Sequence, residues 1–537
     1  MEVDRFELHG SFDDKVAIDT LNKILYVERG TLGDPVLLTC IERNAQRGKK
    51  YTVRAVDFDE IATLRNQGFR QTHVSKEEQD MLNRGEAIDI ISTAAKYRAS
   101  DIHFMNRGQH CEIQIVVKGG LRVLSRKQQQ SGEALMRAIY QGLAKVRDSS
   151  FQELEFQNAQ IPGDVLPNTG LSSVRIVRGP CYPESMGGAF MTMRLQYNSN
   201  KPEKIKLPQL EEPRKPEGSF QLGNTGWTRS NIEKIRLLMD SPSGVVIFTG
   251  PTGSGKTTSL FEVLQESARQ KPHLRLVTIE DPVEYPMPWA VQMAVTNAKN
   301  DGETGAAFGD RVRVALRMAP NNILLGELRG PDVAVSAIEA AVTGHQVWTT
   351  MHVNDPFQFV DRLEIMDSTR LDRRVFCDHK TVQGVIGQRL LAKLCRHCSK
   401  LNSEVNVLSD RLLRSLSTWG DISRVRVKGE GCEHCNYDGT VERFAVAEVV
   451  VFDSEVMSDF IEFGSEIART KYRARPDSDP SMLVASIAYV LGGAVDPRAV
   501  EEKVERIDPK PVPVPVRKVP ALVSATASKE QKLHANA

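Results

Sequence analysis

The stretch that decides the fold is Val245-Val246-Ile247-Phe248-Thr249-Gly250-Pro251-Thr252-Gly253-Ser254-Gly255-Lys256-Thr257-Thr258, followed by a helix-like segment, 259–264. An apolar run leads into a glycine loop and then a helix, which is the context that G-x-x-x-x-G-K-[ST] requires. Glycines let backbone N–H groups turn toward a phosphate, and the helix start adds positive potential. Lys256 is placed to reach the β- and γ-phosphates, and the Thr257 hydroxyl is placed to ligate magnesium. The sequence therefore predicts a nucleoside triphosphate site built by residues 250–258.

Composition limits the class of protein. The chain has 537 residues, 40% hydrophobic and 26% charged, which is enough for about three domains with real cores. The net charge of +1 lacks the basic footprint of a nucleic-acid binder, so no nucleic acid is expected as the main partner. The N-terminus is charged, and the longest apolar-leaning run, 482–495, is too short to span a bilayer. We expect the chain to stay in the cytoplasm.

Four of the eight cysteines form two C-x-x-C pairs: Cys395 with Cys398, and Cys432 with Cys435. In a reducing compartment such pairs indicate a tetrahedral zinc site rather than disulfides. Four thiolates would fill the zinc shell, so the site is expected to be structural, with His397 and His434 as exposed neighbours. The alternative is two independent turns with reduced thiols, because the 33 residues between the pairs exceed a compact zinc ribbon. The other cysteines are expected to be buried hydrophobic residues: Cys40, Cys111, Cys181 and Cys377.

The first half of the chain divides by periodicity and composition. Residues 1–80 hold strand-like pieces at 35–40 and 51–56 but no chemical motif, so their role is not readable. A helical pattern from Glu86 and alternating strands at 112–117 and 189–194 predict an α+β domain over 81–197. A Lys-, Pro- and Glu-rich segment, 198–226, reads as a linker.

In the second half, strands alternate with helices around the phosphate loop over 227–390, which predicts a parallel sheet flanked by helices. A zinc-binding subdomain over 391–445 and a helical region over 446–507 follow, with Asp496 and Pro497 as N-cap and first residue of the last helix. The Pro- and Ala-rich tail, 508–537, is expected to be disordered. The predicted fold class is therefore α/β and multidomain.

Three clusters follow the phosphate loop at the ends of apolar strands, where open α/β sheets present their ligands. One strand ends in Glu280-Asp281-Pro282-Val283-Glu284, and the next ends in Gly326-Glu327-Leu328-Arg329, in the place of a Walker B element. The segment 343–355 then places His345 and His352 on either side of an apolar strand. Each cluster alone would favour a solvated Glu or a structural His. Together and in this order they indicate a motor driven by a nucleoside triphosphate.

At these positions the chain resembles the secretion ATPase superfamily that powers type II secretion and type IV pilus assembly. The resemblance covers roughly residues 85 to 500 and rests on a set of ordered motifs: Ala99-Ser100-Asp101-Ile102-His103, the phosphate loop, 280–284, 326–329, 343–355, Gln388-Arg389-Leu390 and the paired C-x-x-C.

The resemblance implies a RecA-like motor domain preceded by a PAS-like N2 domain. It further implies a homohexameric ring, peripheral at the inner membrane, that hydrolyses Mg-ATP. Such rings act through a membrane platform protein to assemble pilin or pseudopilin fibres, and the C-x-x-C pairs favour the assembly branch over the retraction branch.

The chain also departs from the family pattern. Gly330 stands where the family commonly has Asp, with Asp332 as a nearby acidic substitute. The segment 438–448 matches the usual Gly-Arg-x-x-x-x-Glu only loosely, and 297–309 is poorly matched. These departures suggest a divergent subfamily, such as one that builds a plasmid-borne conjugative thin pilus.

For hydrolysis, Lys256 would stabilise charge on the β- and γ-oxygens, and Thr257 would hold magnesium. Glu327 is expected beside the metal, and Glu280 is the first choice to orient or deprotonate the attacking water. The division of roles between the two glutamates stays open.

His345 and His352 resemble γ-phosphate sensors of the family, and the alternative is packing around Trp348. Positive charge for the transition state would come from Arg175 or Arg194, the catalytic candidates of the N2 domain, or from other arginines: Arg178, Arg313 and Arg317. Charged strand faces are the alternative for all of these arginines.

Two further functions remain as alternatives to the assembly motor. A RecA-like ring could translocate DNA, against which the near-neutral charge argues. A nucleotide-binding scaffold without turnover is the non-enzymatic alternative, against which the intact Lys256, Thr257, Glu280 and Glu327 argue.

Overall fold

A computed structural model describes residues 12, 14–32, 34–46, 48–66, 76–108, 110–198, 207–295 and 301–511. The chain divides into two compact units. The first comprises Met1–Leu390 and Arg443–Met482, and the second comprises Leu391–Glu442 and Leu483–Ala537. Parts of the predicted linker (199–206) and loop (296–300), and most of the predicted disordered tail (512–537), lie outside the described residues.

A small three-stranded sheet opens the first unit, in the order β1 (Val16–Asp19), β2 (Ile24–Glu28), β3 (Thr52–Val56), with helices α1 (Pro35–Gln46) and α2 (Phe58–Asn66). The predicted strand at 51–56 is confirmed as β3. The prediction of a strand at 35–40 is wrong, because these residues lie in α1. Asp34 accepts a hydrogen bond from the Leu37 N–H at 3.2 Å, as an N-cap does, and Pro35 suits the first helical position.

The second sheet of this unit has seven antiparallel strands in the order β6-β5-β4-β10-β9-β8-β7. Their bounds are β4 (Asp101–Arg107), β5 (His110–Val117), β6 (Gly120–Gln128), β7 (Val146–Arg147), β8 (Gln157–Pro162), β9 (Leu171–Pro180) and β10 (Ala189–Tyr197). Helices α3 (Lys76–Lys96) and α4 (Gln129–Arg137) bury Ile91 and Leu135 against Phe104 and Met191 on one face. The predicted strands at 112–117 and 189–194 lie in β5 and β10.

The third sheet carries the phosphate loop, and its seven strands run in the order β13-β12-β14-β15-β11-β16-β19. Their bounds are β11 (Gly244–Thr249), β12 (Leu276–Glu280), β13 (Ala290–Ala294), β14 (Asn322–Leu325), β15 (Gln346–Met351), β16 (Val382–Leu394) and β19 (Thr440–Val451). The pairs from β13 through β16 are parallel, as the alternation of strands and helices predicts.

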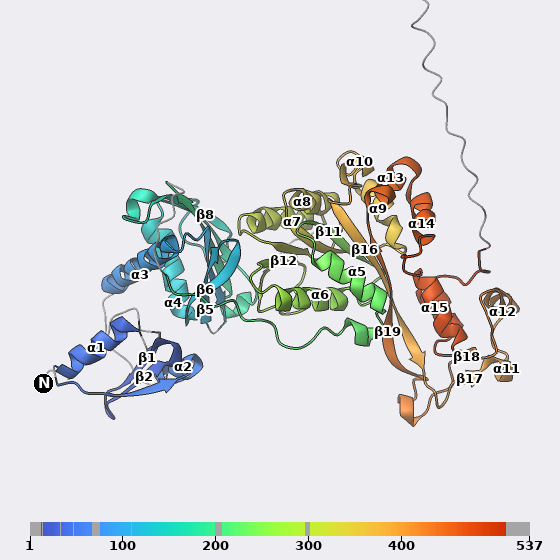
Figure 1. Ribbon diagram of the computed structural model, residues 1–537, viewed down its shortest axis with the longest axis horizontal. Coiled ribbons are helices and arrows are strands. Elements are labelled where there is room, and N and C mark those ends of the chain that lie inside the picture. Colours follow the sequence, from blue (N-terminus) through green and yellow to red (C-terminus); the bar gives the residue numbers. More distant parts are fainter. Residues whose placement is uncertain are drawn as a thin grey trace, which may run out of the picture. The chain divides into compact units, whose positions relative to one another are not determined.

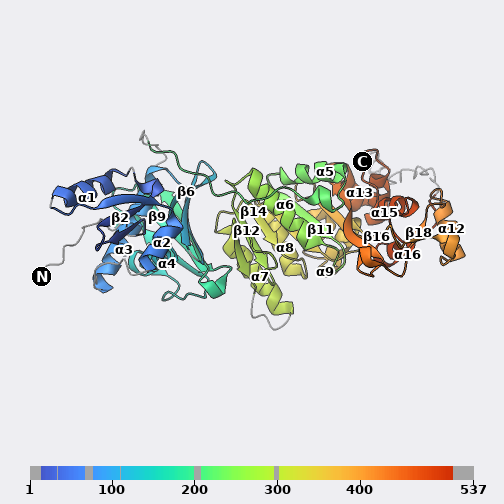
Figure 2. The ribbon, with the colours of Figure 1, turned by 90° about the horizontal axis from the view of Figure 1, so that it is seen from below.

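Helices cover both faces of this sheet: α5 (Arg229–Met239), α6 (Lys256–Gln270), α7 (Asp301–Leu316) and α8 (Pro331–Val342). Alternate side chains of β11 point to opposite faces: Val245 and Ile247 pack with α7 and α8, while Val246 and Phe248 pack with α5 and α6. Figure 1 shows α7 and α8 on one side of the strands and α5 and α6 on the other, and Figure 2 shows these helices around β11, β12 and β14 in the turned view. Because both faces of this sheet are buried, its strands carry apolar side chains toward both faces.

Four shorter helices complete the first unit: α9 (Phe359–Met366), α10 (Arg373–Phe376), α13 (Ser454–Phe463) and α14 (Ser465–Arg473). The predicted helical region, 446–507, thus starts inside β19, and its helices are shared between the two units.

Edge strand β13 is covered by the seven-stranded antiparallel domain. Arg107 Nη2 donates to the Ala290 carbonyl at 3.1 Å, and the Tyr182 N–H donates to the Gln292 carbonyl at 2.8 Å. Met105, Val177 and Phe190 of that domain belong to the same buried cluster as the β13 side chains. Backbone carbonyls at the outer edge of the third sheet are therefore already hydrogen-bonded to that domain.

The second unit contains β17 (Lys400–Leu401), β18 (Arg426–Val427), α11 (Asn402–Val405), α12 (Asp410–Ser417), most of α15 (Met482–Leu491) and α16 (Pro497–Lys503). The predicted start of the last helix is confirmed, because Asp496 caps α16 by accepting the Arg498 N–H, with Pro497 in the first turn. Within the described ranges, no helix combines the length and apolar character needed to cross a membrane.

Candidate nucleotide site and four-cysteine cluster

The phosphate loop joins β11 to α6 and packs tightly against β16. Gly255 sits at the N-cap of α6 with a φ of +81°, a left-handed conformation that glycine adopts without strain. A Cβ on Gly250 would lie 2.6 Å from the Gln388 carbonyl oxygen and 2.7 Å from Ser254 Oγ. Gln388 Nε2 in turn donates to the Ser254 carbonyl at 2.8 Å. The strand, loop and helix order of the prediction is confirmed, with β16 bracing the loop from behind.

Lys256 is buried at the first position of α6. Its Nζ donates to the carbonyl oxygens of Gly250 at 2.7 Å and Pro251 at 3.0 Å. Burial lowers the pKa of Lys256 to about 8, against the opposing charge of Glu327. An ammonium that is desolvated and held by neutral carbonyls gains strongly from an anion in the loop.

The loop opens on a cavity of about 440 Å³. Its walls come from the loop, from the ends of β12, β14 and β15, and from α7: Thr252, Gly253, Ser254, Gly255, Lys256, Thr257, Thr258, Glu280, Asp281, Pro282, Glu284, Phe308, Gly326, Glu327, Arg329, Thr350 and His352. Three clusters that the sequence places far apart are thus brought to one site. Gly250 and Pro251 lie at the start of the loop and do not line this cavity.

Glu280 ends β12 and is buried, with 5% of its surface exposed. Its Oε1 accepts hydrogen bonds from Thr278 Oγ1 at 2.6 Å and from Gln292 Nε2 at 3.0 Å. Burial raises the pKa of Glu280, while these two donors oppose the shift. A carboxylate whose pKa is moved toward neutrality suits proton transfer.

Glu327 follows the end of β14 and lies between the side chains of Arg329 and His352. Its Oε2 accepts from Arg329 Nε at 2.9 Å, and its Oε1 lies 3.3 Å from His352 Nε2. Burial and the nearby Lys256 lower the pKa of His352, and Glu327 opposes this. Arg329 also pairs with Asp281 at 3.3 Å, which links the ends of β12 and β14.

His345 lies at the other end of β15. Its carbonyl accepts from the N–H of Gly244, the first residue of β11, whereas the phosphate loop follows the last residue of that strand. The six residues of β15 separate His345 from His352 by about 20 Å. The ring of His345 instead contacts the Ala340 carbonyl at 3.0 Å. Of the two histidines predicted as γ-phosphate sensors, His352 lines the cavity and His345 does not.

The candidate arginines differ in their surroundings. Arg175 and Arg194 are exposed and directly opposite each other on β9 and β10, on the face that also carries His103. Arg194 Nε pairs with Asp101 at 3.0 Å. Arg178 is buried, stacks on Phe151 and donates to the backbone carbonyls of residues 152, 153 and 155, so its charge is used inside its own domain. The two candidates of the motor domain lie elsewhere: Arg313 of α7 pairs with Asp310, and Arg317, which directly follows α7, donates to Asn158.

Acidic Asp332 does not reach the cavity. It lies in the first turn of α8 and pairs with Arg370 at 2.8 Å. Gly330 is the N-cap residue of the same helix.

The loosely matched segment 438–448 ends in a buried ion pair. Glu448 is 1% exposed, and both of its oxygens accept from Arg473 at 2.7 Å. Arg473 also donates to Asp355 at 2.8 Å, three residues after His352. This network ties β19 and α14 to the segment that follows β15.

Sequence reasoning missed Gln292, which is 2% exposed on β13 and bonds to Glu280. The available signal was a single amide within the apolar run Ala290-Val291-Gln292-Met293-Ala294. A buried amide must satisfy several hydrogen bonds, and a nearby carboxylate is an obvious acceptor.

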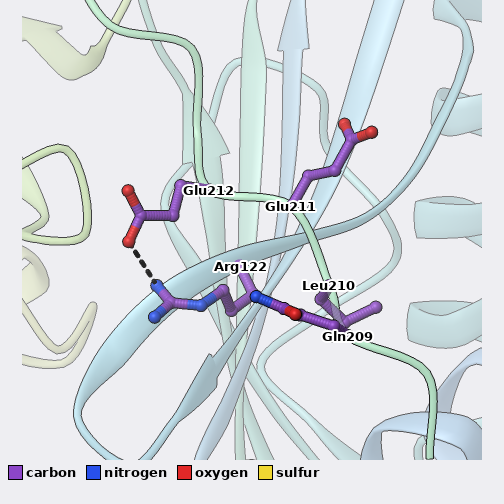
Figure 3. A pocket seen from close by; sticks show the side chains of 5 residues that line it. All are labelled: Arg122, Gln209, Leu210, Glu211 and Glu212. Carbon is purple, nitrogen blue, oxygen red and sulfur yellow. Dashed lines mark ion pairs between the residues drawn. The ribbon is translucent and has the colours of Figure 1, made fainter.

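A second cavity, of about 400 Å³, lies between β6 and the segment 209–212 and is separate from the phosphate loop. Figure 3 shows Glu212 directed at Arg122, 3.6 Å away, and Glu211 turned from it. The Val123 N–H donates to the Glu211 carbonyl at 2.9 Å, so this segment covers the edge of β6.

In the second unit, the four predicted cysteines form one cluster whose sulfurs all lie within 4.8 Å of one another. Individual Sγ–Sγ distances are 3.7 Å for Cys395 with Cys432, and 3.8 Å for Cys435 with both Cys398 and Cys432. A tetrahedral zinc with bonds of about 2.3 Å has edges of about 3.8 Å, so the donor set fits this ion. The alternative of two independent turns is wrong, because the two C-x-x-C pairs converge in one cluster.

Backbone donors favour the thiolate of Cys435, whereas desolvation and neighbouring thiols raise the pKa of Cys398 and Cys432. Desolvation acts to raise the pKa of Cys435, but the N–H groups of Cys432 and Gly439 donate to its sulfur and lower the pKa to about 6. His397 and His434 are exposed and stack with ring centroids 3.8 Å apart, outside the sulfur cluster. Among the single cysteines, Cys111, Cys181 and Cys377 are buried as predicted, whereas Cys40 is half-buried.

The chain is similar in sequence to proteins of type IV pilus assembly and type II secretion. The type IV pilus assembly ATPase PilB of Thermus thermophilus is 29% identical over 71% of this chain and 39% of its own length. The type II secretion system protein E of Dickeya dadantii is 29% identical over 70% of this chain and 67% of its own. Thus the chain spans about two fifths of the first relative and about two thirds of the second. Among solved structures, the pilus retraction motor PilT with bound ADP matches 77% of this chain and 96% of its own, with 19% identity and a TM-score of 0.38.

A family model described as type II/IV secretion system protein matches residues 76–502. This range contains the phosphate loop, the carboxylates and histidine that face it, and all four clustered cysteines. The chain therefore belongs to the type II/IV secretion system protein family.

Proposed function

We propose that this chain hydrolyses ATP and works as the motor of fibre assembly in a type IV pilus or type II secretion system. The observation that carries the proposal is the single cavity in which Lys256, Glu280, Glu327 and His352 meet. A scaffold without turnover would not require two carboxylates and a histidine at the phosphate end of the loop. The pathway is proposed from the relatives, a type IV pilus assembly ATPase and a type II secretion system protein E.

Each residue has a proposed role in hydrolysis. Lys256 leaves the carbonyls of Gly250 and Pro251 to bind the β- and γ-phosphates, because a phosphate is the stronger acceptor. Thr257 holds magnesium, which when bound neutralises developing charge on the phosphates. Glu280 accepts a proton from the attacking water, which its raised pKa supports.

Glu327 and His352 form the second wall of the site. We assign the Glu327 carboxylate to the region beside the metal, where Arg329 and His352 hold it in place. His352 reports the presence of the γ-phosphate, because it lines the cavity and contacts Glu327.

Charge from a neighbouring subunit completes the proposed site. Arg175 and Arg194 are exposed on one strand pair, and we assign them to the nucleotide site of the adjacent subunit in a homohexamer. The partner that receives the motion is proposed to be a membrane platform protein, with pilin or pseudopilin as the assembled subunit. The four cysteines are proposed to hold one structural zinc ion, which would close the excursion between β16 and β19.

The test is release of phosphate from ATP by the purified chain in the presence of magnesium, with and without DNA. We expect hydrolysis that DNA does not stimulate. Strong stimulation by DNA would indicate a translocase, and nucleotide binding without any phosphate release would indicate a scaffold.

A further inference from the structure

The buried amide of Gln292 joins three parts of the candidate site. Its Nε2 donates to Glu280 Oε1 at 3.0 Å and to the Tyr285 carbonyl at 2.9 Å, and its Oε1 accepts from the Met287 N–H at 2.6 Å. Two acceptors face the nitrogen and one donor faces the oxygen, so only one orientation of the amide satisfies all three contacts. Gln292 is therefore locked by its surroundings rather than free to rotate.

From this geometry we infer that Gln292 is a positioning residue, which holds the Glu280 carboxylate in its hydrolytic orientation. The inference rests on the proposed function, since it assumes that Glu280 accepts the proton of the attacking water. Register supports it: β13 pairs with β12 in parallel, with Gln292 opposite Thr278, the other residue that donates to Glu280 Oε1. Both side-chain donors bind Oε1, and the backbone N–H of Glu284 also donates to the carboxylate.

Gln292 also connects Glu280 to the preceding domain. The backbone carbonyl of Gln292 accepts the Tyr182 N–H at 2.8 Å, at the covered edge of the sheet. One residue thus contacts that domain through its main chain and the catalytic carboxylate through its side chain. A displacement of β13 would move the donor relative to Glu280.

The groups around Glu280 determine whether loss of the Gln292 donor raises or lowers the pKa of this carboxyl. Besides these donors, Glu280 shares the cavity with titratable or charged groups from every surrounding element: Lys256 of α6, Asp281 and Glu284 after β12, Glu327 and Arg329 after β14, and His352 after β15. Burial and the negative charge of Glu284 raise the pKa of Glu280, whereas the hydrogen bonds from Thr278, from Gln292 and from the Glu284 backbone lower it. Loss of that donor therefore raises the pKa, so hydrolysis should be lost at a higher pH as the solution is acidified.

The experiment measures single-turnover ATP hydrolysis against pH for the full chain and for Gln292→Met, which fills a similar volume without a donor. We expect the acid limb of the rate profile to move upward by about one pH unit. Binding of a non-hydrolysable ATP analogue should change by less than about twofold, because Glu280 acts on the water rather than on nucleotide affinity. Gln292→Glu should move the limb further upward, since a second carboxylate disfavours ionisation of the first.

Gln346→Met is the matched control. Gln346 is likewise 2% exposed at the start of a strand in the same sheet, but its amide donates to the Leu238 carbonyl, away from the cavity. Its acid limb should coincide with that of the parent. A Gln292→Met protein that is slower or less stable but keeps the parental acid limb would overturn the positioning role.

A readout without turnover separates this inference from the proposed function. The carboxyl titration of Glu280 can be followed by infrared spectroscopy with labelled glutamate, using Glu280→Gln as the blank. We expect Gln292→Met to raise the measured pKa. A parent chain that hydrolyses no ATP would refute the proposed function alone, whereas an unchanged Glu280 pKa would refute the contact on which the inference stands.

Discussion

His352 Nε2 lies 3.3 Å from Glu327 Oε1, across the ends of two adjacent parallel strands. The other carboxylate oxygen of Glu327 accepts from Arg329 at 2.9 Å. Glu327 is thus oriented by neighbouring side chains of the protein, and preorganised groups need little rearrangement during a reaction.

Glu327→Gln should bind ATP but hydrolyse it at least about a hundredfold more slowly, because the amide cannot provide the negative charge beside the metal. The slow variant should also accumulate a nucleotide-loaded ring. Equilibrium binding, phosphate release and mass photometry check the three expectations. Monomers alone with ATP, for parent and variant, would count against a ring.

Lys256→Ala should abolish measurable hydrolysis, because the phosphates lose the one loop ammonium that faces them. The fold should persist, since Nζ is held only by two loop carbonyls. Circular dichroism and phosphate release test this. Lys271→Ala serves as the control at the other end of α6, where Nζ pairs with the exposed Asp240. A Lys256→Ala chain as active as the parent would refute the site.

Arg175→Ala should reduce turnover without weakening ATP binding, if its guanidinium serves the neighbouring subunit. Mixing Arg175→Ala with Lys256→Ala subunits should restore part of the activity, because an intact loop then meets an intact arginine. Arg313→Ala, which removes an exposed side chain paired with Asp310, should retain parental rates. Failure of the mixture to exceed the sum of its components would argue against action across subunits.

Removal of one cysteine should disorder the excursion between the two C-x-x-C pairs. Cys432→Ser is expected to lower the zinc content from about one ion per chain and to expose residues 399–431 to protease. Nucleotide binding should remain, because the loop is built by other elements. Metal analysis and limited proteolysis provide the measurements. Zinc-free parent protein with a protected excursion would exclude the structural metal.

Arg473→Met should destabilise the first unit by about 3 to 5 kcal/mol, because Glu448 is left buried without its partner. Burial already raises the pKa of Glu448 above that of an unfolded glutamate, so its stabilising contribution falls as the pH rises. Without Arg473 this pKa rises further, and the difference in Tm from the parent should be larger at pH 8 than at pH 5. The control, Arg475→Met, removes pairs to the more exposed Asp453 and Glu455 and should cost less.

The phosphate loop and its neighbouring strands were predictable because an entire strand, loop and helix is encoded in one local segment. Convergence of the cysteines was predictable because spacing and residue type restrict the possible ligands. Three features were not. Segment 35–40 has strand-like composition but begins a helix at Asp34 and Pro35. The ends of β15 separate His345 from His352, which a short sequence distance conceals. The bond from Gln292 to Glu280 depends on parallel register, which a linear pattern does not encode.

The covered edge of β13 affects how this protein can be divided. A fragment that starts at the motor domain would lose Arg107 and Tyr182, the donors to the carbonyls of Ala290 and Gln292. It would also uncover the apolar side chains that pack with Met105 and Phe190. An unpaired strand beside an exposed apolar surface is a template for intermolecular β-pairing. Truncation at the linker is therefore expected to yield aggregates. By covering this edge, the preceding domain keeps the motor domain from aggregating.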